Sequence, residues 1–255
     1  MTAKGSKRAK VRMTLLETMT ALENAGSEQT RKTYLRHGAK APLFGVSFAT
    51  LKTLLKTIGA DHELAVALWD TGNLDARNLA VKIVDPIQMT PQDLDQWARW
   101  DVPRACGGYV AVVASEGPHG LSRATVWLAA QDLPQRATGW TLVGVLALRD
   151  EQTPDRWFLD RIAEIEASIH TAPNGLRVPM NLALIQIGCR NAEMREAATA
   201  AAKRIGKVDT DHGDTACKTP DAASSIDKTW THSTSKGFES PAAHERSRES
   251  MRLRC

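Results

Sequence analysis

The sequence predicts an all-α protein in which helical hairpins stack on one another to form an α-solenoid. Apolar residues recur at helical spacing along most of the 255-residue chain, and no segment shows the sustained alternation of a half-buried strand. Aromatic residues make up only 5% of the chain, which is low for a β protein. Because a short helical hairpin cannot bury its apolar side alone, its neighbours must cover that side by stacking. A compact helical bundle is the alternative that the same pattern allows.

Five of the predicted helices begin at a residue that can cap the first turn. A side-chain oxygen at this position accepts a hydrogen bond from a backbone N–H that has no partner within the helix. In chain order, these residues are Asp61, Asn73, Thr90, Thr153 and Asn191. Proline follows Thr90 and Thr153 directly, and it is well tolerated in a first turn. Behind Asn73, the apolar positions follow helical spacing at Ala76, Leu79, Ala80, Ile83 and Val84.

The other helices are predicted from apolar spacing, over residues 15–25, 27–37, 47–58, 103–115, 121–131, 135–148 and 175–187. With the capped helices they amount to some twelve helices of about 8–16 residues, which is an ordinary helix length. They predict a helical repeat domain at residues 13–206. Residues 207–237 are polar and form a C-terminal extension, with one short helix expected at 221–230. Residues 238–255 are rich in charge and poor in apolar side chains, which predicts a disordered tail.

Charge and cysteine content restrict the environment and the partners. The chain is 42% hydrophobic without any run of eighteen apolar residues, so we expect no contact with a membrane interior. Cys106, Cys189, Cys217 and Cys255 lie far apart, which favours reduced thiols in a cytoplasmic protein. The net charge is +4, but the basic tail at residues 1–12 contributes five cations and no acid, so the rest sums to about −1. A nucleic-acid surface on the folded part therefore requires that charges be sorted to one side.

Several motifs of known chemistry are missing from the sequence. It contains no phosphate-binding loop, no dinucleotide fingerprint and no nucleophile elbow. Asp211, His212 and Cys217 are metal-ligand types, but their spacing closes no known zinc site. We therefore expect no cofactor and no metal.

One central segment gathers residues that could carry chemistry. Residues 97–106 put Trp97, Trp100, Asp101 and Arg104 on one short helical stretch. Trp97 fits a core position, whereas Trp100 ends its helix beside Asp101 and close to a proline, so the core does not account for it. Arg136 begins a later helix, where a cation gains little from the helix dipole. A bound anion would explain Arg136, and a solvated surface position is the alternative.

A series of short stretches is similar to one known family. The stretches lie at residues 33–38, 44–46, 68–69, 75–80, 180–181, 187–188, 205–208, 211–213 and 216–221. They cover roughly residues 13–230 in order, and they resemble the DNA alkylation repair glycosylases of the AlkD-like family. This resemblance implies a HEAT-like-repeat α-solenoid whose concave basic face holds duplex DNA. It also implies a family chemistry in which purines alkylated at N3 or N7 are excised without a deep base-flipping pocket.

The resemblance assigns roles to four positions of this chain. The family needs a carboxylate that stabilises the developing oxocarbenium charge, with aromatic rings beside it. The first aromatic falls on Trp100, and a phosphate-binding arginine falls on Arg136. The catalytic aspartate, however, falls on Arg104, and the second aromatic falls near Leu184, which has no ring. A cation at position 104 opposes the developing charge, which implies weak or absent glycosylase activity.

Three hypotheses remain open at this point. In the first, the protein binds duplex DNA, alkylated or distorted, with phosphate contacts from Arg104, Arg136, Lys32, Arg36 and Lys40. In the second, the protein is an active glycosylase that uses Asp101 beside Trp100; alternatively, Asp101 pairs with Arg104 or caps the next helix. In the third, a helical scaffold binds a protein partner, which the near-neutral charge of residues 13–255 motivates. We expect a monomer in each case.

Overall fold

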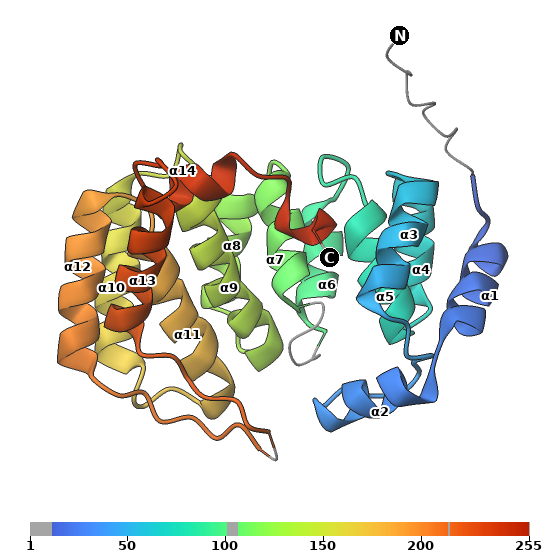
Figure 1. The fold of residues 1–255 in the computed structure, drawn as a ribbon, viewed down its shortest axis with the longest axis horizontal. Helices are drawn as coiled ribbons and strands as arrows, with labels where there is room; N and C mark the ends of the chain where they lie inside the picture. Colours follow the sequence, from blue (N-terminus) through green and yellow to red (C-terminus); the bar gives the residue numbers. More distant parts are fainter. Residues whose placement is uncertain (1–11, 101–106, 214, 255) are drawn as a thin grey trace, which may run out of the picture. The chain divides into compact units, whose positions relative to one another are not determined.

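The computed structural model describes residues 12–100, 107–213 and 215–254, and within them it contains fourteen α-helices, one short 3₁₀-helix and no strand (Figure 1). The predicted all-α class is confirmed. The helices belong to two compact units, of which unit 1 comprises Met1–Gln88, Val102–Cys106 and Met251–Cys255. Unit 2 comprises Met89–Asp101 and Gly107–Ser250. No helix of the described residues is long and apolar enough to cross a membrane.

Unit 1 contains the first five helices and the last short one. Their bounds are α1 Leu15–Ala25, α2 Glu28–Arg36, α3 Phe48–Ile58, α4 His62–Asp70, α5 Leu74–Ile83 and the 3₁₀-helix η1 Met251–Leu253. Helices α4 and α5 form a hairpin, against which α1 packs, and α3 and η1 both pack on α5. Helix α5 is therefore the central helix of unit 1, and all but one of its ten residues are buried.

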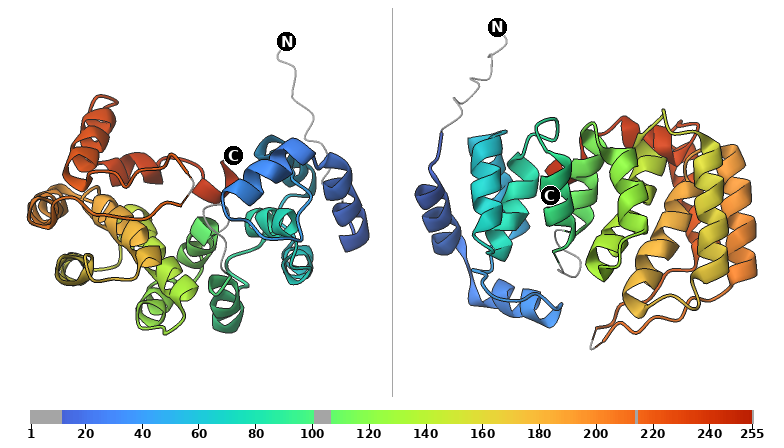
Figure 2. Two further views of the ribbon diagram at one scale, coloured as in Figure 1. Left: turned by 90° about the horizontal axis from the view of Figure 1, so that it is seen from below. Right: turned by 180° about the vertical axis from the view of Figure 1, so that it is seen from behind.

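Unit 2 is a stack of helical hairpins. Its helices are α6 Pro91–Ala98, α7 Gly107–Glu116, α8 Gly120–Leu128, α9 Leu133–Arg149, α10 Asp155–Ser168, α11 Asn174–Ile187, α12 Ala192–Ile205, α13 Ala222–Thr234 and α14 Pro241–Arg246. The pairs α6/α7, α8/α9, α10/α11 and α12/α13 each pack as a hairpin. One layer is formed by α7, α9, α11 and α13, which pack in sequence, and α14 lies on α9 and α13 (Figure 2). The stacking that the sequence predicts is thus present within unit 2.

Four of the five predicted helix caps are confirmed. Asp61, Asn73, Thr90 and Asn191 each accept a hydrogen bond from a backbone N–H of the following first turn. The prediction for Thr153 is wrong, because α10 starts after Pro154 and has no side-chain cap. The hydroxyl of Thr153 donates instead to the carboxylate of Asp150, in the loop that precedes α10.

A buried carboxylate organises the loop before α3. Asp75 on α5 is fully buried, and it accepts hydrogen bonds from the backbone N–H groups of Phe44, Gly45 and Val46 at 2.6, 2.9 and 2.9 Å. Gly45 has φ +83°, and a Cβ there would lie 2.6 Å from backbone atoms in the first turn of α2. Two stretches of the family resemblance, 44–46 and 75–80, are therefore in direct contact, although some thirty residues separate them along the chain.

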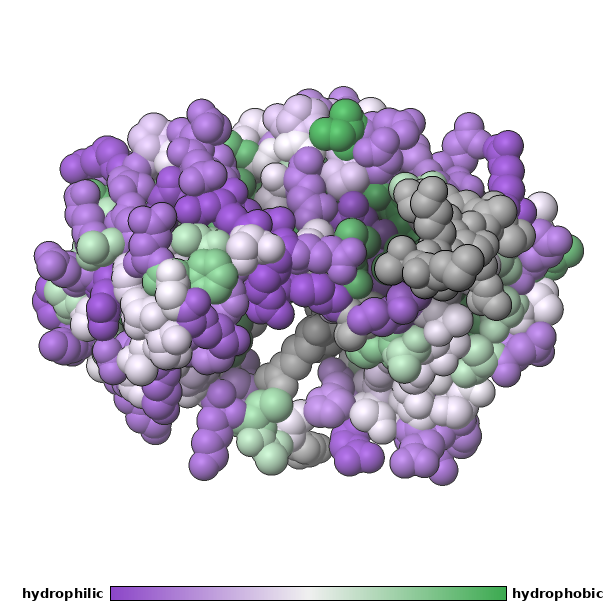
Figure 3. Space-filling view, turned by 45° about the horizontal axis from the view of Figure 1, so that its top comes forward, coloured by the Kyte–Doolittle hydropathy of each residue, from purple (hydrophilic) through white to green (hydrophobic). Residues whose placement is uncertain are grey.

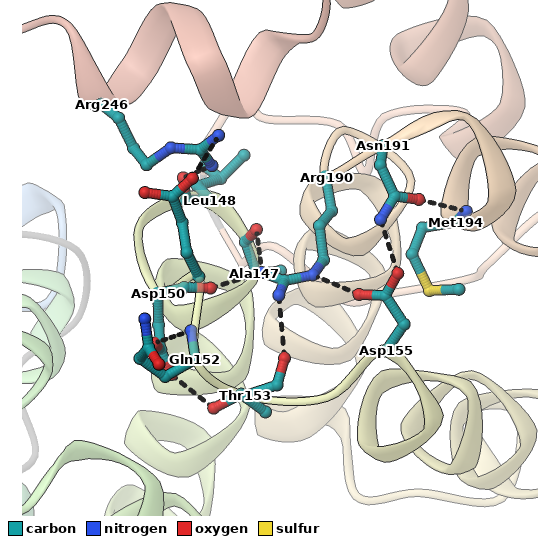
Figure 4. A network of polar contacts seen from close by, with 11 residues as sticks. Ala147, Leu148, Asp150, Gln152, Thr153, Asp155, Arg190, Asn191, Met194 and Arg246 are labelled. Carbon is teal, nitrogen blue, oxygen red and sulfur yellow. Dashed lines mark hydrogen bonds and ion pairs between the residues drawn. The ribbon is translucent and has the colours of Figure 1, made fainter.

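A second buried network joins consecutive hairpins of unit 2 (Figure 4). Arg190, in the turn between α11 and α12, donates to Asp155 at 2.7 Å and to three backbone carbonyls, those of Ala147, Asp150 and Thr153. Its guanidinium also lies 4.5 Å from the ring centre of Phe158. Burial raises the pKa of Asp155, but the hydrogen bonds from Arg190 and Asn191 outweigh this, so the net pKa is below the ordinary carboxyl value. One side chain thus ties the end of α9 and the start of α10 to α12.

The structure differs from the expectation of disorder over residues 238–255. Helix α14 begins at Pro241, with Ser240 as its cap, and Ala242 is fully buried. Glu245 and Arg246 of α14 contact α9 through Arg149 at 3.2 Å and the Leu148 carbonyl at 3.4 Å. The prediction rested on composition, and composition does not reveal that particular charged side chains have fixed partners elsewhere in the chain.

Candidate nucleic-acid interface

Two of the predicted site residues lie outside the described residues. These are Asp101 and Arg104, within the segment 101–106. The candidate site is therefore built from two described parts of unit 2, the end of α6, which precedes this segment in the sequence, and the start of α9.

The end of α6 is fixed by contacts with α8 and α9. Asp95 accepts hydrogen bonds from Trp127 Nε1 at 2.6 Å and from Arg123 at 3.0 Å, both on α8. The carbonyl of Ala98 accepts a hydrogen bond from the hydroxyl of Thr138 on α9 at 3.3 Å. Since α6 ends at Ala98, these contacts hold its last turn beside the first turns of α9.

The two tryptophans of this region have different surroundings. Trp97 is 2% exposed, which confirms the predicted core position. Trp100 follows the last turn of α6 and is half-buried. The contacts of Ala98 with α9 place Trp100 near the same end of α9 that carries Arg136.

Arg136 lies in the first turn of the longest helix. Helix α9 has Asp132 as its N-cap, which accepts a hydrogen bond from the backbone N–H of Gln135 at 2.8 Å. Arg136 is half-buried, and its Nε is shielded from solvent without a hydrogen-bond partner among the described residues. A buried donor of this kind is costly unless something accepts its hydrogen bond. The positive end of the helix dipole adds to the charge of the guanidinium, so an anion is the matching ligand.

The position implied for a second aromatic is not on the surface. Leu184 is fully buried in α11, whereas Leu182 is 43% exposed. The more accessible side of α11 also carries Val178, Pro179 and Gln186. These four side chains have neither a charge nor an aromatic ring, so this side of α11 can provide apolar contacts and an amide but no aromatic stacking surface.

A group of cations lies on α2 of unit 1. Lys32 and Arg36 are exposed on this helix, Lys40 is exposed shortly after it, and α2 itself has no buried residue. Lys32 pairs with Glu28 at 3.9 Å, but both side chains are more than 60% exposed, so this pair is weak and accessible to competing anions. Arg31, which the sequence analysis missed, lies one position before Lys32 and pairs with the same carboxylate at 3.6 Å.

The polar residues of the loop after α12 stabilise turns. The backbone of Asp211 exchanges two hydrogen bonds with the side chain of Asn174, both at 2.9 Å, and its carboxylate accepts from the backbone of Gly213. His212 contacts Thr219 at 2.9 Å. Within the described part of the chain, no three His, Cys, Asp or Glu side chains gather as metal ligands would.

Comparison with known proteins agrees with this architecture. The family model described as DNA alkylation repair enzyme matches residues 18–224. The chain is 30% identical over 217 residues to the uncharacterized protein Lmo0209 of Listeria monocytogenes and 28% identical over 215 residues to Lin0241 of Listeria innocua. Each match covers 82% of this chain and 92% of the relative.

A solved structure is also similar, with a TM-score of 0.79 and 29% identity over 89% of this chain and 96% of the other. That protein is described as one of a new family related to the HEAT-like repeat DNA glycosylases with affinity for branched DNA structures. The family resemblance and the HEAT-like helical fold expected from the sequence are thereby confirmed.

Proposed function

The chain belongs to the DNA alkylation repair enzyme family, and we propose that it binds duplex DNA, with a preference for branched DNA, and has weak or absent N-glycosylase activity. In this proposal Arg136 contacts a phosphate at the start of α9, and Trp100 lies against the sugar or base beside it. Lys32, Arg36 and Lys40 supply further phosphate contacts from unit 1, and Arg104 supplies another.

The observation that carries the proposal is the buried Nε of Arg136, which has no acceptor among the described residues. Rotation of the half-buried side chain towards a phosphate would supply that acceptor, and the first turn of α9 would add its favourable dipole. Affinity for branched DNA in a protein 29% identical to this chain supports the choice of DNA over other polyanions.

The test is DNA binding by fluorescence anisotropy, with a labelled four-way junction and a linear duplex of equal length. We expect tighter binding to the junction, and a log affinity that falls linearly with log salt for both. Arg136→Ala should weaken binding by about tenfold and reduce the salt slope by about one. The matched control is Arg156→Ala, which removes an exposed cation from α10 and should leave both quantities unchanged. Undetectable binding at low salt would exclude the proposal.

We infer weak or absent glycosylase activity because the family resemblance puts Arg104 at the position of the catalytic aspartate. A transition state with developing positive charge is stabilised by a carboxylate, and loss of one such group typically costs about 10²–10³ in rate. The assay is release of 7-methylguanine and 3-methyladenine from methylated duplex DNA. Release near the uncatalysed rate is expected. Fast release that Asp101→Asn abolishes would overturn this part of the proposal and establish Asp101 as the catalytic residue.

A scaffold for a protein partner is less well supported. On the face shown in Figure 3, hydrophilic residues predominate outside the grey atoms, and hydrophobic residues are scattered singly or in small groups. Such scattering is normal for a protein surface and does not mark a docking area. Absence of DNA binding together with an intact fold would favour the scaffold hypothesis.

A further inference from the structure

The end of the chain is an integral part of unit 1. The stretch Gly107–Ser250 belongs to unit 2, but the residues after it belong to unit 1, where η1 packs on α5. Arg252 is only 7% exposed, and its guanidinium donates to the carbonyls of Val81 and Lys82 at 3.1 and 2.8 Å. These carbonyls lie in the last turn of α5, where a cation also interacts favourably with the helix dipole.

The contact is reciprocal, because α5 also holds the backbone of the C-terminal segment. Lys82 is 1% exposed, and its Nζ donates to the carbonyl of Arg252 at 2.8 Å. A buried ammonium group is strongly destabilised without such an acceptor. The C-terminal segment therefore supplies a hydrogen-bond acceptor to a buried lysine of unit 1, from 170 positions further along the chain.

Lys82 also connects this contact to the basic helix α2. Its Nζ lies 5.9 Å from the ring centre of Phe48, the first residue of α3. The same ring meets Tyr34 of α2 edge to face, at 6.3 Å between centres. The hydroxyl of Tyr34 donates to the carbonyl of Val46 at 2.7 Å, in the loop that Asp75 of α5 organises. Helix α2 has no buried residue, so these contacts with Phe48 and Val46 are important for its position.

We propose that residues 251–254 act as a C-terminal clasp that completes unit 1 and positions the basic helix α2 through Lys82, Phe48 and Tyr34. With the clasp in place, α5 keeps its last turn, Phe48 stays between Lys82 and Tyr34, and the cations of α2 are held on an ordered helix. Release of the clasp exposes the end of α5 and loosens α2, while the hairpin stack of unit 2 remains folded.

The test is hydrogen–deuterium exchange of the full-length protein, followed by mass spectrometry. In Arg252→Ala and in a chain ending at Ser250, peptides from α5 and from α2 should exchange about tenfold faster. Peptides from α9 and α11 of unit 2 should keep their rates. The matched control is Arg248→Ala, an exposed cation of the same C-terminal region, which should change neither helix.

Each other outcome overturns the proposal. Unchanged exchange in α5 would show that the clasp contributes nothing to unit 1, and faster exchange in α5 with unchanged α2 would break the connection through Phe48. Equal acceleration of exchange in unit 2 would indicate general destabilisation.

If the shortened chain does not fold, Lys82→Met decides the question, because it keeps the apolar volume and removes the Nζ donor. In this variant, residues 247–254 and α2 should both exchange faster. None of these measurements involves DNA, so the result stands independently of the proposed function.

Discussion

Arg190 and Arg136 are two shielded arginines of unit 2 with opposite surroundings. Arg190 is 9% exposed and fully engaged, with one carboxylate, three carbonyls and an aromatic ring around its guanidinium. Arg136 is half-buried in the first turn of α9, and its shielded Nε has no acceptor within the described residues. The first side chain is saturated by the fold itself, and the second retains hydrogen-bonding capacity for a ligand. The contrast is therefore between an arginine whose hydrogen bonds are all made within the fold and one that, in the proposed function, contacts a phosphate.

Removal of Arg190 is the strongest way to test this contrast. Arg190→Met keeps an apolar side chain of similar length but leaves Asp155 and three carbonyls without their donor. We expect a loss of about 3–5 kcal/mol in the free energy of unfolding, measured by urea denaturation. Arg156→Met, one residue from Asp155 on the exposed side of α10, should cost less than about 1 kcal/mol. Equal effects of the two variants would contradict the structural role of Arg190.

The partner carboxylate gives a pH-dependent form of the same test. The pKa of Asp155 is lower in the folded chain than its ordinary value, because the hydrogen bonds from Arg190 and Asn191 outweigh burial. The contribution of the Asp155 carboxylate to the free energy of unfolding is complete above the ordinary carboxyl pKa of about 4. It disappears as the pH falls through the lower pKa that Asp155 has in the folded chain. We expect Asp155→Asn to lose about 1–2 kcal/mol at neutral pH. Its deficit relative to the unmodified protein should shrink below pH 4 in acid titrations followed by circular dichroism, and a constant deficit would contradict this origin.

Substitution of Arg136 should have the smallest effect on the free energy of unfolding. Its Nε forms no hydrogen bond that folding would lose, so Arg136→Ala should change the free energy of unfolding by less than about 0.5 kcal/mol. The same variant carries the expected tenfold loss in DNA binding, which makes stability and function separable at this position. A large destabilisation, measured by urea denaturation, would show that Arg136 is structural after all.

The candidate site was only partly predictable from the sequence. Arg136 was identified because a cation at the start of a helix has no local explanation, and the structure adds a shielded, unsatisfied Nε. Trp97 was assigned to the core and Trp100 was not, and their different burial agrees with this. The resemblance puts the second aromatic of the family near Leu184, which is fully buried, whereas Leu182, two residues before it, lies on another side of the helix and is 43% exposed. Arg31 was missed because nothing in its local spacing separates it from an ordinary solvated cation.

Local sequence signals are sufficient to predict the helices and most of the residues at which they begin. Apolar spacing and capping residues act over three or four positions, so a one-dimensional pattern contains them, as at Asn73 and α5. The long-range polar contacts arise only when the helices pack. Asp75 meets residues 44–46, Arg190 meets four acceptors around α9 and α10, and Arg252 reaches α5 from the far end of the chain. These contacts give α14 and η1 their partners, and they satisfy the guanidinium of Arg190 but not the Nε of Arg136. Such side chains depend on partners tens of residues away, and no local periodicity records which partner folding brings to them.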